Sequence, residues 1–168
     1  EYLNFISCSG IGDGSLTHSI QGGTPPYTFQ WVDNDGSFLS ESQDIFDLSD
    51  GVYGLEAVDA TGCSGFQEFI VGEPNPLTIN NLSSYVTDVT CYNGSNGSLA
   101  AVNQFVSGGS QPYQSIILDA NGDVSNPNAL NAGNYAITIT DDNGCTTTGN
   151  FIVTEPNPLN LSLSSSAI

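Results

Sequence analysis

The chain repeats its own sequence once, at a spacing of about 82 residues. The stretch FIVGEPNPL ends at Leu77, and FIVTEPNPL ends at Leu159. Two further blocks match in the same order: GGTPPY at 22–27 with GGSQPY at 108–113, and LSDGVYGLEAVDATGC at 48–63 with LNAGNYAITITDDNGC at 130–145. A fixed internal period of this size is typical of tandem arrays built from one small structural unit.

The phase of the repeat predicts three segments. Residues 1–7 match 84–90, and residues 159–168 match 77–86. We therefore expect residues 1–76 to form a repeat that lacks its first strand and residues 77–158 to form a complete one. Residues 159–168 are predicted to be the first strand of a following repeat, as in a window cut from a longer array.

Each repeat is predicted to be an all-β, immunoglobulin-like sandwich. The segment YTFQW puts Tyr27, Phe29 and Trp31 on one face, and YAITIT puts Tyr135, Ile137 and Ile139 on one face. This period of two gives a core face and a solvent face. About seven short strands per repeat, separated by Gly, Asn, Asp and Pro, point to tandem immunoglobulin-like domains.

Two tyrosines are predicted to be structural. Tyr53 and Tyr135 each close the pattern Leu-x-x-Gly-x-Tyr. The spacing resembles the tyrosine corner of immunoglobulin-like sandwiches, where the hydroxyl binds a nearby backbone carbonyl.

Each repeat holds two cysteines at matching places, and four cysteines allow three pairings. The repeat favours the pairs Cys8–Cys63 and Cys91–Cys145, because each unit is then cross-linked on its own. Such loops would stabilise each unit by roughly 4 kcal/mol on the chain-entropy model. The alternative is four buried free thiols; a zinc site is disfavoured because no close cysteine pair is present.

Charge excludes several classes of function. The chain has no Lys or Arg and 18 Asp plus Glu, for a formal net charge of −18. Binding to nucleic acid or to an anionic membrane needs basic side chains, so neither is expected. No apolar stretch approaches the roughly 20 residues of a membrane span, so we expect no direct insertion.

No catalytic residues are predicted, and any cofactor would be calcium. His18 is the only histidine, and its counterpart in the second repeat is Ala101. Calcium prefers clustered oxygen ligands. The candidates recur at the same places in both repeats; they are Asp59, Glu73, Asn75, Asp141, Glu155 and Asn157.

The repeated EPNPL junction is predicted to be a stiff connector. Pro74 and Pro76 in the first copy, and Pro156 and Pro158 in the second, fix their own φ and restrict the preceding residue. The connector would limit how one repeat tilts relative to the next.

Taken together, the blocks C…NGS, GGTPPYTFQW, L…G.Y…V.D..GC and V.EPNPL resemble the SprB-type repeat, and they span essentially the whole chain. The second copy departs from the pattern, since GGSQPYQSI has no Trp. The resemblance implies a long cell-surface adhesin of gliding or biofilm-forming Bacteroidota, exported by type IX secretion. It supplies no catalytic residues.

The sequence therefore predicts a structural stalk segment of an extracellular adhesin or filament. Its expected partners are neighbouring repeats of the same chain, with surface glycans or other cells as further candidates. Two alternatives stay open. One is a carbohydrate-binding module that uses Trp31 and Tyr27, and the other is a non-catalytic linker array of a large secreted enzyme.

Overall fold

The chain forms two compact units that meet between Pro76 and Leu77, called module 1 and module 2 below. The computed structural model describes residues 2–163. In that range the regular structure is β-strand plus two short 3₁₀ turns, with no α-helix, which confirms the all-β class. None of the described helical turns has the length and apolarity needed to cross a membrane.

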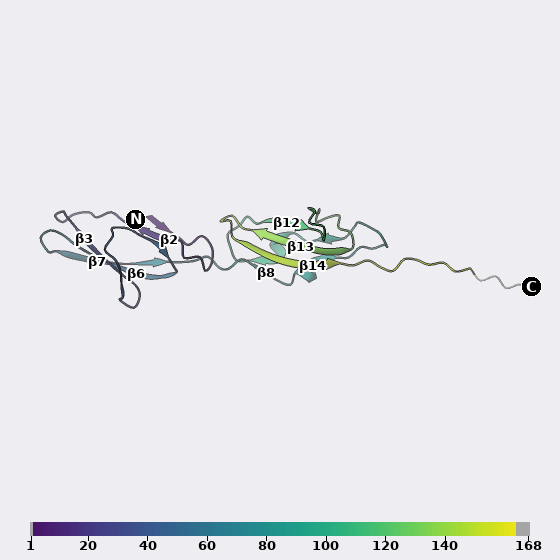
Figure 1. Ribbon diagram of the computed structural model, residues 1–168, viewed down its shortest axis with the longest axis horizontal. Helices are drawn as coiled ribbons and strands as arrows, with labels where there is room; N and C mark the ends of the chain where they lie inside the picture. The colour runs from purple at the N-terminus through teal and green to yellow at the C-terminus, as the bar shows by residue number, and fades with distance from the viewer. Residues whose placement is uncertain (1, 164–168) are drawn as a thin grey trace, which may run out of the picture. The chain divides into compact units, whose positions relative to one another are not determined.

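Module 1 is a sandwich of two antiparallel sheets (Figure 1). One sheet has the strand order β4-β3-β6-β7 and the other the order β1-β2-β5. These orders are those of the two sheets of an immunoglobulin-like domain. The strands are β1 Tyr2–Asn4, β2 Gly14–Thr17, β3 Thr28–Val32, β4 Phe38–Ser40, β5 Ile45–Leu48, β6 Gly51–Val58 and β7 Ser64–Val71.

Module 2 repeats the long hairpin and adds a strand before it. A three-stranded sheet has the order β12-β13-β14, and two short pairs, β8-β11 and β9-β10, complete the unit. The strands are β8 Thr78–Ile79, β9 Val86–Thr87, β10 Ser98–Leu99, β11 Val106–Ser107, β12 Gln114–Leu118, β13 Gly133–Thr140 and β14 Thr146–Val153. The 3₁₀ turns are η1 Leu82–Tyr85 and η2 Val102–Gln104.

The last strand of each module defines its two ends. β7 and β14 have eight residues each, which corresponds to a length of about 26 Å at about 3.3 Å per residue. We call the end where β7 or β14 begins the inlet end of its module. The outlet end is where that strand stops and the EPNPL connector begins.

Each module has its own core, and the predicted alternation is confirmed. Trp31 is fully buried in module 1, and Ile137 and Ile139 are buried in module 2. The module 1 core draws on both sheets, because Leu16 of β2 and Leu55 of β6 belong to the same buried cluster. Burial of these faces is the main term that holds each sandwich together.

The first strand of module 2 has no counterpart among the described residues of module 1. β1 corresponds to β9, because Leu3 pairs with Leu16 in the same way that Val86 pairs with Leu99. β8, which pairs with β11, is thus peculiar to module 2 within the described range.

The strand predicted at residues 159–168 is not seen where it can be assessed. Leu159, Leu161 and Leu163 are 90% or more exposed and belong to no strand. The physical reason is that a single strand needs a partner sheet, and no third module follows in these 168 residues. Residues 164–168 lie outside the described part of the chain.

Candidate functional site

Both tyrosine corners have the hydrogen bond expected from their spacing. The Tyr53 hydroxyl donates to the Ser49 carbonyl at 3.0 Å, and the Tyr135 hydroxyl donates to the Asn131 carbonyl at 3.0 Å. Each bond fastens the start of a long strand to the turn before it. Burial raises the pKa of Tyr53, and the negative charges of Asp50 and Asp33 raise it further.

The inlet end of module 1 is organised by one carboxylate, Asp59. Its Oδ1 accepts the backbone N–H groups of Thr61 and Cys63, and its Oδ2 accepts that of Thr24. The side chain thereby joins the β6–β7 turn to the loop after Gly23. These hydrogen bonds, led by the Thr61 hydroxyl and followed by the Cys63 and Thr24 amides, lower the pKa of Asp59 to about 2.

The inlet end of module 2 has the same design. Asp141 Oδ1 accepts the N–H groups of Asn143 and Cys145, and its Oδ2 accepts that of Ser110. Leu77 enters the module at this end, since the Cβ position at Gly109 would lie 3.0 Å from its side chain. Each inlet end is therefore a turn and a Gly-Gly loop held together by one Asp.

The outlet end is organised by the Glu of the EPNPL connector. Glu73 accepts the Gly10 N–H at 2.7 Å, and Glu155 accepts the Asn93 N–H at 2.6 Å. Gly10 and Asn93 both have positive φ, at 78° and 58°, which turns the amide toward the connector. Each module thus binds the first residue of its own exit segment.

The predicted cysteine pairs are wrong, because the two cysteines of a module lie at opposite ends. Cys8 lies at the outlet end, since Ser9 and Gly10 next to it hydrogen-bond to Glu73. Cys63 directly precedes β7 and so lies at the inlet end. A separation of about 26 Å is several times the Cα spacing of about 6 Å that a disulfide allows.

Module 2 gives the same result from its own geometry. Cys91 lies near Glu155 at the outlet end, and Cys145 directly precedes β14 at the inlet end. Cys63 and Cys91 are free, exposed thiols. Cys8 and Cys145 are disulfide-bonded. The protein therefore contains disulfide chemistry, but neither Cys8–Cys63 nor Cys91–Cys145 forms.

The four acidic calcium candidates divide between the ends in the same way, and the other two, Asn75 and Asn157, lie in the EPNPL connectors. Asp59 and Asp141 are at inlet ends, where they bind backbone amides, and Glu73 and Glu155 are at outlet ends. Within one module these oxygens are separated by the length of the last strand. Among the described residues no group of three or more His, Cys, Asp or Glu side chains is arranged to hold a metal ion.

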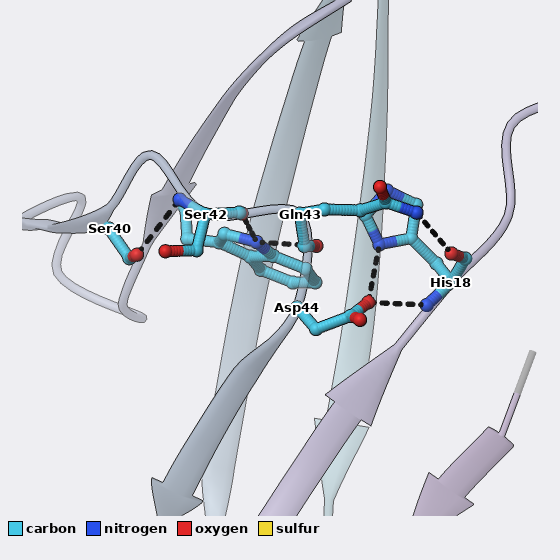
Figure 2. Close-up of polar contacts among 6 residues, drawn as sticks. His18, Ser40, Ser42, Gln43 and Asp44 are labelled. Carbon is cyan, nitrogen blue, oxygen red and sulfur yellow. Dashed lines mark hydrogen bonds and ion pairs between the residues drawn. The ribbon is translucent and has the colours of Figure 1, made fainter.

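The single histidine and the single tryptophan belong to the core of module 1. Figure 2 shows Asp44 beside His18, with its Oδ1 3.8 Å from His18 Nδ1, and Gln43 donating to the His18 carbonyl. Trp31 Nε1 donates to the Ser42 carbonyl at 3.0 Å, and its ring is fully buried. A buried indole cannot stack on a sugar, so Trp31 does not serve the carbohydrate-binding alternative.

Several structural residues were missed by sequence reasoning. Tyr27 and Tyr113 donate their hydroxyls to the carbonyls of Gly22 and Gly108, both at 2.6 Å. The sequence places Tyr27 on the apolar face of its strand and also offers it as a sugar-binding aromatic, but it does not predict this hydrogen bond. The repeated Gly-Gly-x-x-Pro-Tyr pattern could have indicated this role, because the same residues in both loops suggest that the two loops share one conformation.

Backbone amides take the place of the missing cations as partners of the carboxylates. Asp33 and Asp119 each accept two backbone amides in the turns after β3 and β12, as expected of hairpin turns. The Asp123 and Asn121 amides lower the pKa of Asp119, and the Thr154 amide lowers that of Asp88. With no Lys or Arg in the chain, backbone N–H groups are the main donors to the acids.

Comparison with known proteins agrees with the repeat. No curated protein matches the chain. Among solved structures, an amphioxus IgVJ-C2 molecule covers 86% of this chain and 97% of its own, at 14% identity and a TM-score of 0.33. The SprB repeat family model matches residues 6–36 and 83–114, one region in each module. These two matches are consistent with a SprB-type repeat, and they indicate similarity to a cell-surface adhesin-type repeat region.

Proposed function

We propose that the two modules are a spacer segment of a long extracellular adhesin, and that they hold its active parts away from the cell. The segment has no catalytic task of its own, and its partners are the adjoining repeats. A role in adhesion or gliding belongs to the whole adhesin, to which this segment contributes reach and direction.

The observation that carries the proposal is the bond between each module and its own connector. Glu73 is bound by the Gly10 amide and the Ser9 hydroxyl, and Glu155 by the Asn93 amide. Two prolines follow each Glu and keep the segment extended. A spacer requires that the chain leave each module in a fixed direction, and this arrangement supplies it twice.

The test is Glu73→Ala, measured by small-angle X-ray scattering in solution. Loss of the Gly10 bond frees the start of the connector, so the range of distances between the modules should broaden. Glu155→Ala is the matched control, because it removes the equivalent bond from a connector that does not join module 1 to module 2. Scattering that is identical for wild type and Glu73→Ala would show that the connector does not set direction.

Calcium at the module ends is a separate proposal with a simple test. A bound cation would relieve the repulsion within a chain of net charge −18. Thermal melting in calcium should then exceed melting in chelator, with magnesium as the control for general ionic screening. Equal midpoints in calcium and chelator would remove calcium from the account.

A further inference from the structure

Module 2 has a pocket at a place that aromatic rings fill in module 1. The pocket has a volume of about 210 Å³, and every side chain that lines it is uncharged. Ala101 and Ser115 lie at its exposed side. The buried side chains of its lining are Leu99, Phe105, Ile117 and Ile137.

The strand register identifies the matching position in module 1. Trp31 pairs with Leu55 in the β3-β6 ladder, and Ile117 pairs with Ile137 in the β12-β13 ladder. Leu55 and Ile137 occupy the same place in the repeated sequence block. Ile117 therefore stands in module 2 where the fully buried Trp31 stands in module 1.

Two further rings complete the filling of this place in module 1. The centroid of the His18 ring lies 5.4 Å from that of Phe29 and 5.8 Å from that of Trp31. In module 2 the residues aligned with His18 and Phe29 are Ala101 and Ser115. Three rings are thus replaced by three smaller side chains, and the pocket is the space between these replacements.

The size and the lining of the pocket suit one aromatic ring system. An apolar cavity of about 150 Å³ binds benzene, so the larger pocket of module 2 accommodates a ring of the size of indole. A charged ligand would lose its hydration in this uncharged lining without gaining an ionic partner. Ser115 and Asn128, both exposed, supply side-chain oxygens that can accept a ring N–H. In module 1 the Ser42 carbonyl accepts the indole N–H of Trp31.

The backbone beside the pocket favours a free molecule over an added peptide strand. The Ser125 amide donates to the Ile117 carbonyl at 2.9 Å, on the edge of β12 that faces away from β13. Leu118 is bridged to Val124 on the same edge. A peptide therefore cannot extend the sheet at Ile117.

We propose that module 2 binds a small, uncharged aromatic molecule of about the size of indole, between Ile117 of β12 and Leu99 of β10. The ligand fills in module 2 the place that side chains fill in module 1, and its affinity comes from the apolar surface that it removes from water. This function goes beyond that of a spacer, because it gives the segment a ligand of its own.

Methyl-detected NMR on the whole 168-residue chain, titrated with indole, tests the proposal. The methyl signals of Leu99, Ile117 and Ile137 should shift and saturate at about millimolar indole, the affinity expected if about 150 Å² of ring surface leaves water. The methyl signals of Leu16 and Leu55, the counterparts of Leu99 and Ile137 in module 1, should not move. Glucose, as a polar ring, should shift neither set.

Ser115→Phe supplies in module 2 the ring that Phe29 supplies in module 1, and it should abolish the shifts. Ile116→Phe is the matched control, because Ile116 is 55% exposed on the opposite face of β12, so the same ring there should leave binding unchanged. Ala101→Leu narrows the pocket from the segment between β10 and η2, and it takes the place of Ser115→Phe if circular dichroism shows the latter to be unfolded.

Four results would each overturn the proposal. They are a wild-type chain without a saturable shift, equal shifts in the two modules, wild-type binding by a folded Ser115→Phe or Ala101→Leu chain, and equal loss of binding in Ile116→Phe.

Discussion

Replacement of Trp31 by alanine should unfold module 1 under conditions where module 2 stays folded. The Trp31 side chain is fully buried, and a buried aromatic side chain of this kind removes about 150–250 Å² from water. At about 25 cal/mol per Å², its loss costs about 4–6 kcal/mol. Measured core substitutions of Trp by Ala give a similar cost of about 3–5 kcal/mol.

A loss of this size is large against the stability of a small domain, which is about 5–15 kcal/mol. In urea, with a slope of about 1.5 kcal/mol per molar, a loss of 4 kcal/mol lowers the midpoint by about 2.7 M. Far-UV circular dichroism should therefore show two transitions in Trp31→Ala, the first shifted by about 2 M or more and the second unchanged.

The wild-type chain offers a selective probe for the same experiment. Trp31 is its only tryptophan, so wild-type fluorescence reports module 1 alone. Phe38→Ala on the adjacent strand is the control, because Phe38 is 58% exposed. This substitution should change the free energy of unfolding by less than about 0.5 kcal/mol. A Trp31→Ala chain with the wild-type midpoint would refute the inward placement of this residue and revive a sugar-binding surface.

Three further predictions follow from the module ends and the tyrosine corners. Tyr135→Phe should destabilise module 2 by about 1 kcal/mol, since it removes a buried hydrogen bond. Tyr53→Phe should destabilise module 1 by less, because Tyr53 is more exposed, and urea titration of both variants measures the two losses. Asp59 stabilises module 1 above its usual pKa of about 3.9, and this contribution is lost as pH falls toward about 2. Between these two pH values, the free energy of unfolding of module 1, followed by Trp31 fluorescence, should therefore fall less in Asp59→Asn than in wild type. An equal pH dependence in the two proteins would show that Asp59 does not make this contribution. Alkylation of the native chain should modify Cys63 and Cys91 and no other cysteine; after digestion with an Asp- or Glu-specific protease, a peptide that links either one to its own module's other cysteine would contradict the geometry.

The sequence was sufficient for the fold class and for the corner tyrosines, because both follow from local spacing. Alternation of apolar residues determines which face is buried, and the Leu-x-x-Gly-x-Tyr spacing places Tyr53 four residues after its acceptor. The predicted pairing of the cysteines was wrong because it depends on long-range contacts. A repeat shows that Cys8 and Cys63 share a module, but their separation depends on which end of β7 residues 6–10 reach. That is set by long-range contacts such as the Ile6 amide on the Gly72 carbonyl, which no spacing along the chain reveals.

The roles of the acids were also beyond the sequence. Glu73 and Asp59 were grouped as candidate cation ligands because their residue types and repetition suit calcium. In the structure both carboxylates accept backbone amides. Glu73 accepts that of Gly10, 63 residues away, and Asp59 accepts those of the nearby Thr61 and Cys63 and that of Thr24, 35 residues away. In a chain without Lys or Arg, the search for donors to a carboxylate should begin with turn amides at positive φ.

The placement of one cysteine at each end makes every module a bifunctional unit in the sense of polymer chemistry. Such a unit cannot close a ring on itself, because its two reactive groups are held apart by a rigid strand. Its cysteines can form disulfide bonds only with groups outside the module, one at each end. The number of such bonds can therefore grow with the number of modules, because none forms within a module. Cys63 at one inlet and Cys91 at one outlet are the two ends still free for linkage in this stretch. Oxidation would then tie units in series, while reduction would leave each sandwich folded and only the links between units open.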